Sequence, residues 1–212
     1  MNAPVSAILD FFFPPKCVFC EKLLQKGERG WCLSCGQDLP ENDRLHLIPG
    51  AEACRAPLRY EGVARSAMIR YKFSGRSSYA EPFSALLYAT VRTTQAELIT
   101  WIPVSARRRL ERGYDQTELL ARALSKRLGI PAVKLLKKKH TKRQSGVGGP
   151  EERRKNIKDA FSVISPEQIQ GKRLLLLDDI CTTGATLNEA VSVLNRSGAS
   201  AIECAVLMMT QE

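Results

Sequence analysis

The stretch LLLLDDICTTGATL, residues 174–187, decides the fold. Four leucines in a row are typical of a central parallel strand that is buried on both faces. The acids and small residues that follow then reach the carboxyl edge of a sheet, where open α/β folds bind ligands. We therefore predict a strand over 173–177, a ligand site at Asp178 and Asp179, and a helix from about Thr186.

The polar part of this stretch suits the two ends of a sugar phosphate. Carboxylates accept hydrogen bonds from neighbouring hydroxyls, such as those of a ribose, or bind a divalent cation that helps to do so. Small residues at a helix N-terminus leave backbone N–H groups open to a phosphate, and the helix dipole adds to the attraction. The sequence thus predicts a ribose 5-phosphate site, with the acids on the ribose and the phosphate on Thr182, Thr183, Gly184, Ala185 and Thr186.

Strands and helices alternate along the rest of the chain. Asp115 and Glu118 form a candidate capping box, and Gly129 stops the helix that they begin. This alternation predicts an α/β fold, a parallel sheet flanked by helices on both faces. The apolar spacing predicts strands over 97–104, 132–136 and 201–208, and helices around 67–71, over 79–91 and from Asp115.

Two basic segments interrupt this pattern. The segment SARRRLERGYD, residues 105–115, carries four arginines, and we expect a loop there. Residues 137–158 form a second, longer basic stretch without an apolar period. Because structure resumes after it, we favour a lid over a solvated tether.

Four cysteines near the N-terminus have the spacing of metal ligands. Each Cys-x-x-Cys turn points two thiolates at one centre, and two such turns complete a closed tetrahedral zinc site. A pair of disulfides and a redox motif are the alternatives. We predict a knuckle domain over 1–50 and a main domain over 51–212, with a structural zinc held by Cys17, Cys20, Cys32 and Cys35.

The composition narrows the partners and the location. The net charge of +10 is enough to attract nucleic acid, acidic lipid or phosphorylated metabolites. In the N-terminal apolar stretch, Asp10 interrupts the run and prolines end it well short of a spanning helix. We expect no membrane insertion, a first helix in place of a signal sequence, and a cytoplasmic protein.

Several motifs together resemble known proteins. Residues 174–187 resemble the signature of type I phosphoribosyltransferases, whose paired acids bind the ribose hydroxyls of phosphoribosyl pyrophosphate (PRPP). The double Cys-x-x-Cys, YKFSGR at 71–76, residues 101–124 and residues 141–161 extend the likeness. As an ordered set they resemble the ComF (GntX-like) competence family over nearly the whole chain.

The resemblance implies a type I phosphoribosyltransferase fold and a magnesium-assisted transfer from PRPP to a nitrogen nucleophile. Asp178 and Asp179 would be the catalytic acids, and the acceptor is not specified. The arginine segment would bind the pyrophosphate, because guanidinium groups match phosphate oxygens. Its candidates are Arg107, Arg108 and Arg112, with Lys72 a lesser one and with Arg143, Gln144 or Arg154 supplied by the lid.

The competence resemblance leaves other functions open. The chain could be a single-stranded DNA-binding factor for uptake or recombination, working with competence or recombination proteins. Backbone phosphates would supply the affinity, and Phe73, Tyr79 or Tyr114 could stack on bases. A regulatory protein that senses PRPP without turnover is the remaining alternative.

Overall fold

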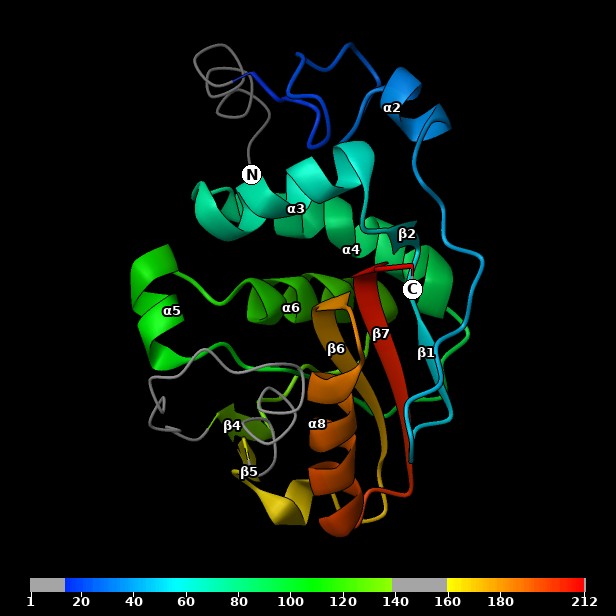
Figure 1. Cartoon of the computed structure of the whole chain (residues 1–212), viewed down its shortest axis with the longest axis vertical. Helices are drawn as coiled ribbons and strands as arrows, with labels where there is room; N and C mark the ends of the chain where they lie inside the picture. The colour runs from blue at the N-terminus through cyan, green and yellow to red at the C-terminus, as the bar shows by residue number, and fades with distance from the viewer. Residues whose placement is uncertain (1–13, 139–159, 212) are drawn as a thin grey trace.

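The computed structural model describes residues 14–138 and 160–211, and its centre is a parallel sheet (Figure 1). The strands are β1 (Ala53–Arg55), β2 (Leu58–Arg59), β3 (Leu98–Trp101), β6 (Arg173–Cys181) and β7 (Ala201–Met209). They run in the order β1, β7, β6, β3, with β2 also paired to β7, and every pairing is parallel. The predicted parallel sheet is confirmed.

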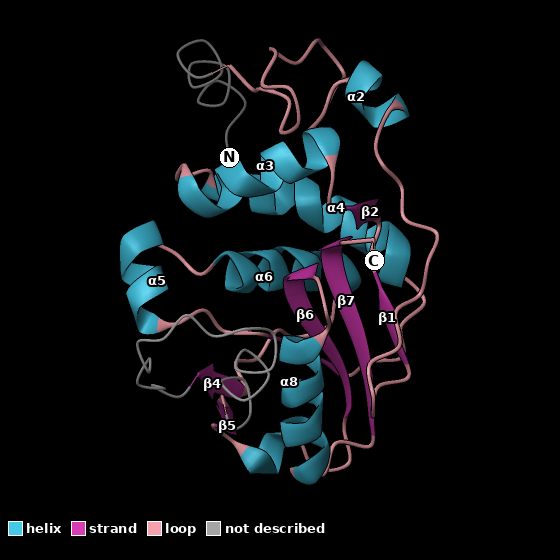
Figure 2. Ribbon diagram, viewed as in Figure 1, coloured by secondary structure: helices cyan, strands magenta, loops and turns pink. Residues whose placement is uncertain are grey.

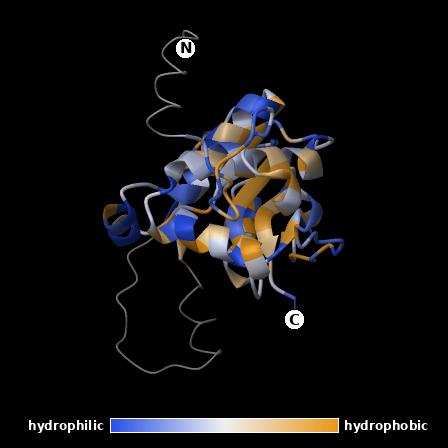
Figure 3. Cartoon of the chain, turned by 90° about the horizontal axis from the view of Figure 1, so that it is seen from above, coloured by the Kyte–Doolittle hydropathy of each residue, from blue (hydrophilic) through white to orange (hydrophobic). Residues whose placement is uncertain are grey.

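Helices cover both faces of this sheet (Figure 2). The helices α3 (Gly62–Phe73), α4 (Ala80–Val91) and α6 (Gln116–Leu128) share one hydrophobic cluster with Leu175 and Leu177. On the other face, α8 (Ala185–Arg196) shares a second cluster with Leu174 and Leu176. All four leucines are fully buried, which explains the unbroken apolar run. Figure 3 shows the hydrophobic residues gathered in the central strands.

The start of α6 confirms Asp115 as the cap, which is one half of the predicted capping box, whereas Glu118 binds Arg122. The Asp115 carboxylate accepts hydrogen bonds from the backbone N–H groups of Thr117, at 3.0 Å, and Glu118, at 3.1 Å. The Glu118 carboxylate pairs with Arg122 at 2.8 Å. Gly129 ends the helix in the left-handed conformation, with a φ of 71°.

The expected loop over 105–115 is wrong, because most of it is the short helix α5 (Ala106–Arg112). Alanine, arginine, leucine and glutamate are good helix formers, so the charge of the segment concealed its propensity. The Ser105 hydroxyl accepts a hydrogen bond from the Arg108 N–H at 3.3 Å, and Gly113 ends the helix. Figure 1 shows α5 at the left edge, away from the sheet.

Two strand predictions also need correction. The strand expected over 132–136 is displaced to β4 (Leu136–Lys138), which pairs antiparallel with β5 (Phe161–Val163) outside the main sheet. Ahead of it, the Val133 N–H donates to the Ile99 carbonyl at 2.9 Å, so the chain follows the sheet edge without forming a strand. The strand expected over 97–104 stops at Trp101, because proline at 103 lacks an N–H.

Shorter elements complete the fold. They are the helix α2 (Leu33–Gln37) and the single 3-10 turns η1 (Ser77–Tyr79) and η2 (Pro166–Gln168). The predicted first helix and the 137–158 lid, with Arg143, Gln144 and Arg154, fall outside the described residues except at positions 137 and 138. In the part of the chain that the structure describes, no helix combines the length and apolar character needed to span a membrane.

Candidate functional site

A cavity of about 180 Å³ lies where β3 and β6 end, at the carboxyl edge of the sheet. Its walls come from α3, the β3–α5 loop, α5, α6, β4, β6 and α8. Residues predicted from the sequence make up much of this lining. They are Lys72, Arg108, Arg112, Asp178, Asp179 and Thr186.

The two acids lie inside β6 and point to opposite faces of the sheet. β6 continues to Cys181, four residues beyond the predicted strand end. Strand alternation places Asp178 on the face of Leu174 and Leu176, and Asp179 on the face of α6. One Asp178 oxygen accepts the backbone N–H of Asp179 at 2.8 Å. A ligand that contacts both acids must therefore span the end of the strand.

Asp179 holds a polar network with two neighbouring helices. Its Oδ1 accepts a hydrogen bond from Lys72 Nζ at 2.8 Å, and its Oδ2 accepts one from Gln116 Nε2 at 2.6 Å. Lys72 sits in the last turn of α3. Sequence reasoning missed Gln116, although it directly follows the predicted cap residue.

Tyrosine hydroxyls fix the two helices that carry these groups. The Tyr71 hydroxyl donates to the Gln116 backbone carbonyl at 2.6 Å, and the Tyr114 hydroxyl donates to the Tyr71 carbonyl. Asp115 connects α6 to the other wall, since its Oδ2 accepts the Val104 N–H at 3.1 Å. These hydrogen bonds thus fix the positions of Lys72, Gln116 and the β3–α5 loop relative to the end of β6.

Positive charge exceeds negative charge in the described lining. Four cations, Lys72, Arg108, Arg112 and Lys138, face the two acids. Three of these cations come before α6 in the sequence, and both acids come after it. Sequence reasoning missed Lys138, which ends β4 and whose ammonium lies 5.8 Å from the Phe161 ring. The excess of cations fits a ligand with several phosphate charges.

Burial shapes the electrostatics of this cavity. Burial, and then the neighbouring charge of Asp179, raise the pKa of the Asp178 carboxyl well above its usual range. Burial lowers the pKa of Arg112, although the guanidinium stays charged. Its Nη1 is buried and has no hydrogen-bond partner among the described residues, which leaves a donor for an incoming anion.

The loop predicted to bind the 5-phosphate leads from β6 into α8. Thr182 and Thr183 are exposed in the turn, and Gly184 precedes the helix with a φ of 69°. A Cβ at Gly184 would lie 2.8 Å from Ile48 Cδ1 and 3.0 Å from His46 Nε2. Only glycine therefore fits without strain. Of this segment, Thr186 lines the cavity, whereas Thr182, Thr183, Gly184 and Ala185 are not among its lining residues.

We expect Gly184→Ala to disturb the loop and weaken phosphate binding. The left-handed backbone costs about 1–2 kcal/mol for a side chain, and the contacts with Ile48 and His46 add to that cost. Thermal unfolding and calorimetry with ribose 5-phosphate would measure the two effects. Gly171→Ala has a similar φ of 71° and no atom within 4 Å of its Cβ, so it controls for backbone strain alone.

Some predicted residues lie outside the cavity. The Arg107 side chain is 78% exposed and pairs with Glu111 at 2.6 Å on the outer side of α5. Among the aromatic candidates for base stacking, Tyr79 is buried and Tyr114 is half-buried. Phe73 is exposed, but the Arg112 guanidinium covers its ring at 4.8 Å. Because its side chain is buried, Tyr79 is not available for stacking on a base.

The four knuckle cysteines converge as a metal site requires. Their sulfur atoms all lie within 4.8 Å of one another. Cys20 Sγ and Cys32 Sγ are 3.7 Å apart, close to the roughly 3.8 Å that separates two thiolates on one tetrahedral zinc. Burial raises the pKa of the Cys17 thiol, but N–H groups of Cys20, Cys32 and Phe19 outweigh it and lower that pKa to about 7. These residues fit a structural zinc, which would tie the knuckle together.

The knuckle is fixed to the body of the protein through α3. Arg70 Nη2 donates to the backbone carbonyls of Val18, at 2.9 Å, and Phe19, at 2.6 Å. Both residues are buried in the cluster that contains α3 and α4. The Phe19 ring packs against Phe83 with centroids 6.2 Å apart. The knuckle therefore shares a core with the helices that carry Lys72 and Gln116.

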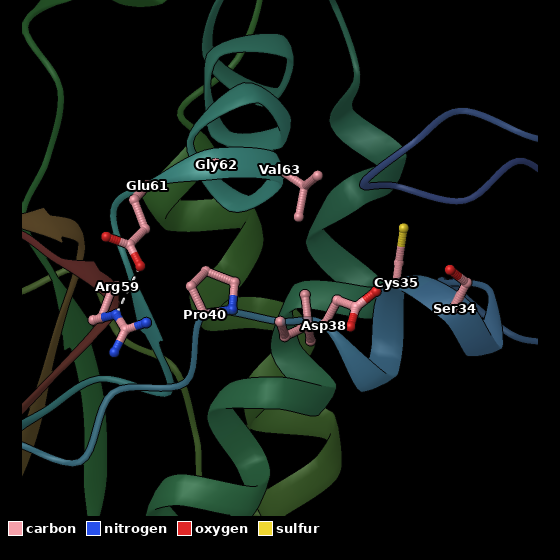
Figure 4. A pocket seen from close by; sticks show the side chains of 9 residues that line it. Ser34, Cys35, Asp38, Pro40, Arg59, Glu61, Gly62 and Val63 are labelled. Carbon is pink, nitrogen blue, oxygen red and sulfur yellow. Dashed lines mark hydrogen bonds and ion pairs between the residues drawn. The ribbon is translucent and has the colours of Figure 1, made fainter.

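A larger hollow of about 680 Å³ lies between α2 and the start of α3 (Figure 4). On one side Arg59 and Glu61 pair with each other at 2.8 Å, and on the other lie Cys35 and Asp38. Its charged pair is already satisfied, and it shares no lining residue with the cavity that contains both acids of β6. We therefore place the functional site in the smaller cavity.

Comparison with known proteins identifies the family of the chain. Residues 117–212 match the family model described as phosphoribosyl transferase domain. The chain is 30% identical over 220 residues to competence protein F of Haemophilus influenzae, covering 91% of this chain and 96% of that protein. It is 31% identical over 188 residues to the DNA utilization protein YhgH of Escherichia coli K12, covering 84% and 78%.

The domain match confirms the expected type I phosphoribosyltransferase fold. Among solved structures, a glutamine PRPP amidotransferase from B. subtilis is similar at 18% identity, over 65% of this chain and 30% of that one, with a TM-score of 0.45.

Proposed function

Since the chain belongs to the competence protein F family and carries a phosphoribosyltransferase domain, we propose that it binds PRPP with magnesium and transfers the phosphoribosyl group to an acceptor. The reaction would occur in the cavity around Asp178 and Asp179. The acceptor is a nitrogen nucleophile whose identity is open.

One observation carries this proposal. Two acids, suited to sugar hydroxyls, and four cations, suited to phosphates, line one small cavity beside a helix N-terminus. PRPP presents these same groups: a vicinal diol between a phosphate and a diphosphate. Residues from distant parts of the chain, Lys72, Arg112 and Asp179, meet there as such a ligand requires.

The residues would act by position and charge. Asp178 and Asp179 would accept hydrogen bonds from the ribose hydroxyls and offset the positive charge that develops at the anomeric carbon. Arg108 and Arg112 would stabilise the departing diphosphate through charge-assisted hydrogen bonds. Magnesium, bound with the diphosphate, would neutralise part of its charge. A covalent enzyme nucleophile is not needed.

Calorimetry with PRPP and magnesium tests the binding, and release of pyrophosphate tests the chemistry. We expect saturable binding that depends on magnesium, and release that rises when the correct nucleobase or amine is added. Binding without release across a panel of acceptors would support a PRPP sensor. The absence of binding by the full-length protein would contradict the proposal.

A second function is favoured by the relatives' names and by the surface of α5. The relatives are named for competence and DNA utilization, and α5 exposes Arg107 and Leu110, while its Arg112 contacts the exposed ring of Phe73. Single-stranded DNA would bind this surface through its backbone phosphates. Affinity should then fall steeply as salt rises, and a salt-insensitive interaction would count against this function.

Three arginines of α5 separate the two functions. Replacing Arg108 or Arg112 with alanine should weaken PRPP binding about 10-fold or more, because each replacement removes a charge-assisted hydrogen bond to the diphosphate. Arg107→Ala should leave PRPP binding within about twofold, since Arg107 lies outside the cavity and pairs with Glu111.

DNA binding through the α5 surface should instead respond to all three replacements. Filter binding with a single-stranded oligonucleotide and calorimetry with PRPP would be run on the same three variants. Equal losses of PRPP affinity in all three would contradict the assignment of Arg108 and Arg112 to the cavity.

A further inference from the structure

Two buried polar atoms of residues that line the cavity with Asp179 have no hydrogen-bond partner among the described residues. They are Gln116 Oε1 and Thr117 Oγ1. Gln116 is 3% exposed and Thr117 is 1% exposed, and both side chains line the cavity. A buried polar atom without a partner is destabilising, so such atoms are rare unless a ligand or water completes them.

The chemistry of Gln116 is fixed by its neighbour. Asp179 only accepts hydrogen bonds when ionised, so the Gln116 amide nitrogen must face it, as the 2.6 Å contact shows. The amide oxygen then faces away from Asp179, and an oxygen of this kind only accepts. Its partner must be a donor. The Thr117 hydroxyl can donate or accept, and it lies on the next residue of α6.

We propose that Gln116 and Thr117 form a subsite for a sugar hydroxyl, next to the hydroxyl that Asp179 binds. The inference rests on the proposed function and adds two specificity residues to it. The Gln116 amide oxygen and the Asp179 carboxylate are neighbouring acceptors, because the Gln116 amide nitrogen donates a short hydrogen bond to Asp179. A vicinal diol presents two neighbouring hydroxyl donors that match this pair. The subsite would therefore select ribose over 2-deoxyribose.

Opening of the subsite involves Lys72. Gln116 Oε1 and Thr117 Oγ1 are both shielded from solvent, so a ligand reaches them only after a neighbouring side chain moves. The Lys72 ammonium occupies Asp179 Oδ1 at 2.8 Å and belongs to a long, flexible side chain. A ligand phosphate can take over this ammonium while a ligand hydroxyl replaces it at Asp179.

Calorimetry on the full-length protein tests the subsite with ribose 5-phosphate and 2-deoxyribose 5-phosphate. The wild type should prefer ribose 5-phosphate by about 10-fold or more, because the deoxy sugar leaves a buried acceptor unpaired. Gln116→Met and Thr117→Val should each reduce this preference at least threefold. Thr100→Val, which changes a buried threonine of β3 outside the cavity, should keep it.

A double variant separates direct contact from positioning of Asp179. If Gln116 touches the sugar, adding Gln116→Met to Asp179→Asn should lower ribose 5-phosphate affinity further. If Gln116 only orients Asp179, the double variant should equal Asp179→Asn, and the direct contact is overturned.

The outcomes for the wild type separate this inference from the proposed function. Binding of both sugar phosphates with equal affinity would overturn the subsite and leave PRPP binding intact. Binding of neither sugar phosphate nor PRPP would contradict the proposed function itself. Thermal unfolding of each variant would show that the changes in preference arise in folded protein.

Discussion

Asp178→Asn and Asp179→Asn should each lower PRPP affinity about 10- to 100-fold, and the double variant should show no measurable binding. Above the raised pKa of Asp178, each change removes a charged acceptor for a ribose hydroxyl, and hydrogen bonds to charged groups contribute about 1.5–3 kcal/mol apiece. Calorimetry with PRPP and magnesium would measure the loss. Unchanged affinity in both single variants would contradict the proposed role of the acids.

The two variants should have opposite effects on stability. Burial raises the pKa of Asp178, so between about pH 4 and that raised pKa the folded state binds a proton that the unfolded state has released. Stability therefore falls as the pH rises through this window. Asp178→Asn removes this fall, and its melting temperature should exceed that of the wild type increasingly as the pH rises from about 4.

Asp179→Asn should instead destabilise the protein by roughly 1–3 kcal/mol, because it leaves the Lys72 ammonium without its carboxylate. Melting temperatures of both variants across a pH series would reveal the contrast. Glu203→Gln is a matched control, since Glu203 is a largely buried acid of β7 that pairs with Arg55 outside the cavity. It should bind PRPP as the wild type does.

Loss of the knuckle metal should have the second large effect. Zinc in a closed four-cysteine site contributes on the order of 10 kcal/mol of binding free energy, and that energy is coupled to folding. Cys35→Ala, or a strong chelator, should therefore destabilise the knuckle and the cluster that contains Val18 and Phe19. A loss of even 4 kcal/mol lowers the melting temperature by about 8–16 °C.

Elemental analysis gives an independent measure of the knuckle. Wild-type protein should hold one zinc per chain, and Cys35→Ala should hold much less. Cys204→Ala is the control, because Cys204 is a buried thiol of β7 that lies outside the knuckle and should leave zinc content unchanged. Protein with no zinc and an unaltered melting temperature would refute a structural metal.

The sequence predicted the elements that depend on local pattern. The leucine run identified β6 because a strand buried on both faces has few alternatives, and Asp115 and Gly129 marked α6 through their own backbone contacts. The helix α5 was missed because its arginines concealed helix-forming residues. The strands β1 and β2 were missed because three and two residues are too few for a periodic signal.

The site was predictable only where its residues belong to one continuous motif. The acids and Thr186 come from residues 174–187, so their spacing along the chain revealed them. Gln116 resembles any polar residue at a helix start, and its importance depends on α6 meeting β6. Lys138 was hidden in a basic run for the same reason. Contacts across long sequence separations leave no local pattern.

The distribution of charge around the cavity has a practical consequence for protein engineering. Three of the four cations lie ahead of the segment that matches the domain model, and both acids lie within it. A fragment trimmed to residues 117–212 would retain one cation of the cavity, Lys138, and both acids, Asp178 and Asp179. The net charge of the cavity would change from positive to negative, so it would repel a phosphorylated ligand instead of attracting it. Such a truncated protein would report a false negative for sugar-phosphate affinity.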